Sequence, residues 1–332
     1  MCNSDGIEID PSVLDNADDS DYLSSGYDTS TASLTSSIHE YVFENGRRYH
    51  AYFGADKNLL PTDEIEQDRL DMYHEICLGL LHGDLYKAPI AEHPQRILDI
   101  GTGTGIWAID MADRFPSAEV IGTDLTPIQP AWVPPNCRFE VDDAEKAWTF
   151  KPESFDFVHA RNIAQGISDW PSLMRQVFRS TKPGGYCELV ETGTTCHSDD
   201  GTMTETNGVK VWMETIAAAL VEIGRPPASA EAMKKHLLDA GFVDVEVKTV
   251  REPLGPWPKD RKLKNIGAMV LMNCQTGFHA YGLAAFTRIL GMTKEEADRI
   301  CDNAYNAVRN KNYHCWCPIY VAYGRKPALL EK

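Results

Sequence analysis

The spacing of apolar side chains changes character along the 332-residue chain. Residues 1–40 are rich in Ser, Thr and Asp and poor in apolar side chains, so burial cannot offset the entropy of ordering them. We therefore expect a disordered acidic tail, either a solubilising tail or a regulated docking segment. Residues 41–94 are predicted to form an N-terminal helical cap. Apolar positions recur there at helical spacing over 62–81, and Thr62 or Asp63 can cap that helix.

Short apolar runs alternate with amphipathic stretches between residues 95 and 192. The predicted strands cover 96–100, 120–123, 137–141, 155–159 and 186–191, and the predicted helices cover 104–114 and 171–180, with a turn at 182–185. Alternation of this kind is typical of a parallel sheet with helices on both faces, so the predicted fold class is α/β.

The pattern of residues 193–328 is mainly helical. Helices are predicted over 209–223, 230–240 and about 259–309, and strands over 243–250 and 313–323. Because helices separate the two late strands, we expect a final strand pair with a helical insertion between its members.

Composition restricts the class of partner. The formal net charge is −17, from 32 Lys and Arg against 49 Asp and Glu, which argues against binding to a phosphate backbone. No apolar run approaches the ~20 residues that span a bilayer, and the N-terminus lacks the features of a signal peptide. We expect neither a nucleic-acid nor a membrane partner, and a cytoplasmic location with the nucleus as the alternative.

The nine cysteines are scattered and odd in number, which favours free thiols in a reducing compartment. Cys315 and Cys317 are the only close pair, and no second pair stands at the spacing of a zinc site. We therefore expect no bound metal.

A glycine-rich loop follows the first predicted strand of the sheet. Gly101, Gly103 and Gly105 come directly after Ile100, where that strand ends. Such a turn lies at the carboxyl edge of the sheet, where open α/β folds bind ligands, and glycines let the backbone approach a ligand closely. The dinucleotide fingerprint G-x-G-x-x-G would need a glycine in place of Ile106. The spacing G-x-G-x-G is typical of methyltransferases instead.

This motif predicts S-adenosyl-L-methionine as the cofactor and makes residues 95–192 the cofactor-binding half of the domain. The residues of the loop that we expect to bind it are Asp99, Gly101, Thr102, Gly103 and Gly105.

Polar side chains follow the next three predicted strands at the same edge. Asp124 can accept two hydrogen bonds from vicinal ribose hydroxyls. After the third strand, Asp143 is favoured over Asp142 as the acceptor for the adenine amino group, and Ala144 follows it. Arg161 lies near the place of the methionine part, although a surface role for it is equally compatible with the sequence.

Several stretches of the chain resemble one family. The stretch at 99–110 reads DIGTGTGIWAID, and together the stretches cover 45–50, 60–71, 99–110, 124–130, 133–137, 154–159, 170–171, 182–185, 199–202, 254–258 and 323–327. These stretches look like the motifs of the LaeA-like methyltransferases, a fungal class I family, and the likeness spans about residues 41–328. The resemblance implies one Rossmann-like domain with a seven-stranded, mostly parallel sheet, an antiparallel last strand pair and S-adenosylmethionine as cofactor.

The resemblance also sets the functional alternatives. The family contains enzymes that methylate fungal secondary metabolites at O, N or S, and the leading prediction is such an enzyme with a small-molecule acceptor. It also contains nuclear regulators of secondary-metabolite gene clusters, and this alternative implies regulatory protein partners. A binding module without activity is a third possibility, against which the intact glycines and acids count.

No residue is identified as catalytic from the sequence. His159, near the end of the fourth strand, and His197, just past the fifth, could act as a general base, but each is more often structural. The 41–82 segment and, within residues 193–328, the helices of the 205–240 and 259–310 regions are expected to roof an acceptor pocket. The apolar side chains that would line it, unless they form ordinary helix-packing core, are Trp212, Met213, Trp257, Met269, Met272, Phe278 and Tyr281.

Overall fold

The computed structural model describes residues 40–54 and 58–328. The tail predicted over residues 1–40 lies almost wholly outside the described residues, and its disorder stays a prediction. None of the helices within the described ranges is long and apolar enough to cross a membrane.

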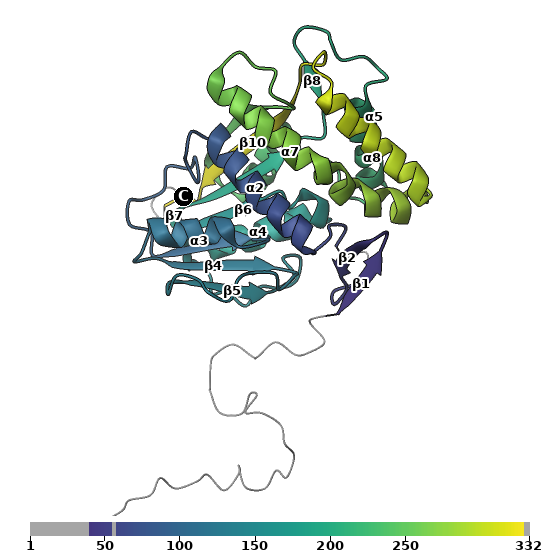
Figure 1. The fold of residues 1–332 in the computed structure, drawn as a ribbon. Helices are drawn as coiled ribbons and strands as arrows, with labels where there is room; N and C mark the ends of the chain where they lie inside the picture. The colour runs from purple at the N-terminus through teal and green to yellow at the C-terminus, as the bar shows by residue number, and fades with distance from the viewer. Residues whose placement is uncertain (1–39, 55–57, 329–332) are drawn as a thin grey trace, which may run out of the picture. The chain divides into compact units, whose positions relative to one another are not determined.

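Within the described part of the chain, an eight-stranded sheet forms the centre of the fold (Figure 1). Five strands run parallel in the order β5 (Cys137–Val141), β4 (Glu119–Asp124), β3 (Arg96–Ile100), β6 (Phe155–Arg161) and β7 (Thr181–Thr192). β10 (Cys315–Arg325) lies antiparallel between β7 and β9 (Val243–Pro253), and the two-residue β8 (His197–Ser198) pairs with the start of β10. The predicted α/β class and antiparallel last pair are confirmed, and β8 is an additional strand.

Neighbouring residues of β3 show that the sheet is covered on both faces. Ile97 belongs to the same buried cluster as residues of α3 (Ile106–Arg114). Leu98 belongs instead to a cluster with residues of α4 (Trp170–Ser180) and α6 (Ala230–Ala240). Because side chains alternate along a strand, a strand buried on both faces must be apolar at consecutive positions, as this one is.

A third buried cluster joins the remaining helices α2 (Glu64–Leu80), α5 (Gly208–Glu222), α7 (Arg261–Ala284) and α8 (Lys294–Arg309). α2 lies along α7 (Figure 1). The single helical stretch predicted over about 259–309 is divided, because a π-helical turn, Ala285–Ile289, ends α7 and Gly291 adopts a φ of +66°. Thr293 then caps α8 through a capping box with Glu296.

Two local predictions are wrong. The cap over 41–94 is not wholly helical, because β1 (Tyr41–Glu44) and β2 (Arg47–His50) form a hairpin at its start. Its turn is Asn45-Gly46, with φ of +53° and +81°, and Asn-Gly is the preferred pair for such a turn. The turn predicted at 182–185 lies inside β7 as an irregularity, where Gly184 has a φ of +79° and the register with β6 shifts.

A buried ion pair fixes α2 against α7. Arg69 donates to both carboxylate oxygens of Glu66, from Nε at 2.8 Å and from Nη2 at 2.6 Å. Asn273 of α7 donates to the Arg69 carbonyl at 2.8 Å, and its own side-chain oxygen lies 3.3 Å from Arg69 Nη1. The guanidinium also lies over the ring of Tyr281. Two helices far apart in the sequence are therefore joined through one buried charge.

We expect Glu66→Gln to lower the free energy of unfolding by about 3–5 kcal/mol, because it leaves the buried Arg69 without a counter-charge. Urea denaturation measures this change. Glu64→Gln is the matched control, since Glu64 is exposed and pairs with Arg48 at the surface, and it should leave stability close to wild type. Equal effects of the two substitutions would contradict this account of the α2–α7 contact.

Candidate active site

The glycine loop between β3 and α3 has no room for a side chain at two of its positions. Gly101 has a φ of +67°, and a Cβ atom there would lie 2.4 Å from Ile163 Cγ2. Gly105 has a φ of +83°, and its Cβ would lie 2.3 Å from the ring of Phe139. Both the backbone conformation and the close approach therefore require glycine at these two positions.

Asp124, at the carboxyl end of β4, holds the middle of this loop. Its Oδ2 accepts a hydrogen bond from the Gly103 amide at 2.8 Å, and its Oδ1 accepts one from the Thr126 amide at 2.9 Å. Burial raises the pKa of Asp124 to about 6, although these two amides oppose the shift. Each carboxylate oxygen keeps a lone pair for a further donor.

A cavity at the end of the parallel strands, which we term the loop cavity, is bounded by this loop. Its lining comprises Asn58, Leu59, Leu60, Ile100, Gly101, Gly103, Thr123, Asp124, Leu125, Asp142, Asp143, Ala144, Asn162, Ile163, Gln165, Gly166 and Ile167. Five of the nine residues predicted to bind the cofactor are among them, namely Gly101, Gly103, Asp124, Asp143 and Ala144. The contribution of 58–60 was not predicted, because nothing in that stretch has a chemical signature of its own.

The other four predicted residues lie beside the loop cavity without lining it. Asp99 is buried behind the loop, where its two oxygens lie 2.6 Å from Thr102 Oγ1 and 2.7 Å from His159 Nδ1. Gly105 is the N-cap of α3. Arg161 turns toward α2, where its Nη2 lies 3.2 Å from His74 Nδ1. The structure gives Asp99 and Thr102 the geometry of residues that position the loop.

Asp142 and Asp143 both reach the loop cavity. Asp143 is the more buried of the two, and its Oδ1 accepts a hydrogen bond from the Glu145 amide at 3.0 Å. Asp142 is half-buried and accepts from the Asp143 amide at 2.8 Å.

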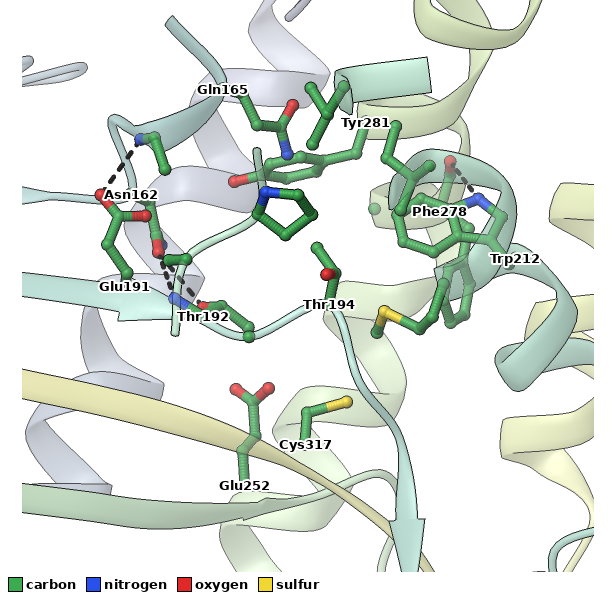
Figure 2. A pocket seen from close by; sticks show the side chains of 18 of the residues that line it. Asn162, Gln165, Glu191, Thr192, Thr194, Trp212, Glu252, Phe278, Tyr281 and Cys317 are labelled. Atoms are coloured by element: carbon green, nitrogen blue, oxygen red, sulfur yellow. Dashed lines mark hydrogen bonds between the residues drawn. The ribbon is translucent and has the colours of Figure 1, made fainter. Parts of the chain in front are cut away.

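A second cavity, which we term the helical cavity, shares two lining residues with the loop cavity, Asn162 and Gln165, both labelled in Figure 2, and we term this shared wall the junction. Its walls come from α2, α5, α7 and the ends of β7, β9 and β10. Trp212, Met213, Phe278 and Tyr281 line it, as the sequence predicts. The other three predicted aromatic and Met side chains, Trp257, Met269 and Met272, do not line it. Trp257 donates to the Cys315 carbonyl, Met269 packs in the helical core, and Met272 is 60% exposed.

Two buried carboxyl groups of the helical cavity were missed from the sequence. Glu191, at the end of β7, accepts hydrogen bonds through Oε1 from the amides of Ile163 at 2.8 Å and Ala164 at 3.1 Å. Burial raises its pKa to about 8. Glu252 of β9 is 5% exposed, and burial raises its pKa to about 7. Glu191 has a sequence signal, an acid at the end of the fifth parallel strand, whereas Glu252 has none.

Neither predicted general base lines the loop cavity or the helical cavity. His159 is buried beside Asp99 and stacks on Trp107 with 3.7 Å between ring centroids. Burial lowers the pKa of His159. His197 stacks on Trp316 near the start of β10. Across residues 40–54 and 58–328, no group of three or more His, Cys, Asp or Glu side chains is placed to hold a metal ion.

A parallel sheet with an antiparallel last pair, a glycine loop after β3 and an acid after β4 define a class I methyltransferase fold. A family model described as a methyltransferase domain matches residues 73–247, more than half of the chain. The chain therefore belongs to the methyltransferases, and it uses S-adenosylmethionine as the methyl donor. The glycine loop and the buried Asp124 suit that donor. The glycines let it lie close to the backbone, and Asp124 offers an acceptor for its hydroxyl groups.

Similar proteins place the chain within the LaeA-like family, as its motifs predict. It is 39% identical to the methyltransferase pytC of Aspergillus terreus over 310 residues, which cover 93% of this chain and 95% of that protein. It is 36% identical to the secondary metabolism regulator LAE1 of Cochliobolus heterostrophus, with 86% and 94% covered. It is 33% identical to the protein-methionine methyltransferase laeA of Emericella nidulans, with 89% and 79% covered.

The pKa of Glu191 makes stability depend on pH. The pKa of Glu191 in the folded state is raised to about 8 from an ordinary 4.5. Its contribution to the free energy of unfolding is therefore fully present below pH 4.5 and is lost as the pH rises from 4.5 through 8. Glu191→Gln removes this ionisation and keeps an oxygen for the two amides. From pH 5 to pH 9 its unfolding free energy should gain on the order of a few kcal/mol relative to wild type.

Urea denaturation at several pH values measures this difference. Glu222→Gln, an exposed site at the end of α5, is the control and should follow the wild-type curve. A constant offset between Glu191→Gln and wild type across the pH range would contradict a buried carboxyl with a raised pKa.

Proposed function

We propose that this protein transfers a methyl group from S-adenosylmethionine to O, N or S of a small, apolar secondary metabolite. The observation that carries the proposal is that the two cavities share Asn162 and Gln165 in their walls. One cavity has the glycines and acids of a nucleotide-like site, and the other is bounded by aromatic and Met side chains. An acceptor in the helical cavity would therefore lie next to a donor in the loop cavity.

Residues of the loop cavity would hold the donor. Gly101 and Gly103 allow its close approach, Asp124 would accept from the ribose hydroxyls, and Asp143 beside Ala144 would accept from the adenine amino group. When bound, S-adenosylmethionine supplies an electrophilic methyl group.

The chain's own contribution to the reaction is alignment and proton removal. Positioning an acceptor in line with the methyl group can supply several kcal/mol of barrier lowering. The loop 162–166 lies at the junction, and Glu191 holds it there by accepting from two of its amides. Glu191 and Glu252 are the carboxyl groups of the helical cavity that could take the proton of a hydroxyl or amine acceptor.

The alternative function is regulation of secondary metabolism through protein partners. It draws support from relatives at 33–36% identity that are named secondary metabolism regulators. The net charge of −17 favours neither nucleic acid nor an anionic membrane as a partner under either function. We propose a cytoplasmic location for the enzyme and a nuclear one for the regulator.

Asp124→Ala should weaken the binding of S-adenosylmethionine by about tenfold or more, because the loop loses its anchor and the ribose loses its acceptor. Isothermal titration calorimetry measures this affinity, and circular dichroism checks that the variant is folded. Asp239→Ala, an exposed aspartate of α6, should bind like wild type. Equal affinities of the Asp124 and Asp239 variants would rule out the ribose assignment.

The acceptor class can be tested with a donor that carries a tritiated methyl group. Incubation with an organic extract of a filamentous fungus should place tritium in molecules that partition into ethyl acetate. The same incubation without extract is the control. Label that enters only the protein fraction would favour the regulatory alternative and would contradict a small-molecule acceptor.

A further inference from the structure

Glu252 is the one carboxyl group of the helical cavity whose place the fold does not explain. It lies on β9 opposite Cys317 of β10, and it is 5% exposed. Its Oε1 is buried and accepts no hydrogen bond from any described residue. In Figure 2 the carboxyl group points from β9 toward the space beside Thr192 and Thr194. Burying an ionisable group without a partner is costly, so a ligand that satisfies it is the simplest reason for its presence.

The other charged side chains of the cavity are engaged elsewhere. Arg69, the only Lys or Arg among the described lining residues, is bound to Glu66 and Asn273. Glu191 accepts from two backbone amides of the junction loop. Glu252 therefore faces no compensating cation across the cavity. An ionised Glu252 would offer an acceptor to a donor on the ligand and would repel an anion, with no free cation of the cavity to offset its charge.

The remaining walls define the body of the ligand. Trp212, Phe278 and Tyr281 supply aromatic surfaces, and Met213, next to Trp212 on α5, adds a flexible apolar side chain. Aromatic rings of this kind pack against flat, apolar molecules. The shape and the charge of the helical cavity therefore both favour a flat, apolar acceptor that carries a hydrogen-bond donor and no negative charge.

We propose that Glu252 determines acceptor specificity by binding an N–H or O–H donor of a flat, apolar acceptor and by excluding acceptors that carry a carboxylate. This inference rests on the proposed function, because it takes the helical cavity as the acceptor site. It assigns Glu252 to recognition of the acceptor and leaves the donor site unchanged.

The test uses the full chain at pH 8, where a Glu252 carboxyl group with a pKa of about 7 is mainly ionised, saturated with S-adenosylhomocysteine, and three naphthalene probes of similar size. These are 2-naphthol, 2-methoxynaphthalene and 2-naphthoate, and their dissociation constants are measured by calorimetry. 2-Naphthol should bind about tenfold or more tighter than either of the others, since it alone offers a neutral O–H donor. In Glu252→Leu the preference over 2-methoxynaphthalene should disappear, and in Glu252→Gln the discrimination against 2-naphthoate should fall.

Glu246→Gln is the matched control, because Glu246 is exposed on the same strand, and it should keep the wild-type preferences. Thermal unfolding checks folding, and Glu252→Gln should melt no lower than wild type because it removes a buried charge. Equal binding of the three probes, no binding of 2-naphthol, or preferences that survive both Glu252 variants would overturn the inference. Failure of S-adenosylhomocysteine to bind would instead overturn the proposed function, so the two failures are distinguishable.

Discussion

The Gly103 amide donates a hydrogen bond to the carboxylate of Asp124 across 2.8 Å, and the arrangement of the site depends on it. This bond holds the glycine loop against the end of β4 and thereby sets the floor of the loop cavity. The same loop also positions α2, because Thr104 donates a hydrogen bond to Asp71 at 2.6 Å and Leu70 packs over Gly103. α2 in turn carries Arg69 and Tyr73 into the wall of the helical cavity.

The junction between the cavities has its own anchors. Asn162, with a φ of +54°, accepts hydrogen bonds from the amide and the hydroxyl of Thr192, and Tyr73 lies 2.7 Å from that hydroxyl. Glu191 accepts from Ile163, which lines the loop cavity, and from Ala164, which lines the helical cavity. Under the proposed function, this one short loop would set the relative position of donor and acceptor, on which methyl transfer depends.

The alternation of strand and helix patterns was enough to predict the parallel sheet, because its central strands β3, β4 and β6 are short and largely buried. The glycine loop and Asp124 could be found because their chemistry follows a strand end directly. The β1–β2 hairpin was missed since its strands are only four residues long, although Asn45-Gly46 marks its turn. Glu252 could not be found, because its place in the cavity depends on the register of β9 against β10, which are separated by two helices.

The most direct test of the account is a crystal structure of the protein with S-adenosylhomocysteine. We predict the ribose at Asp124, the adenine beside Asp143 and Ala144, and the sulfur atom at the junction of Asn162 and Gln165, facing the helical cavity. A ligand bound in the loop cavity with its sulfur directed away from that junction, or a ligand bound outside the loop cavity, would contradict it.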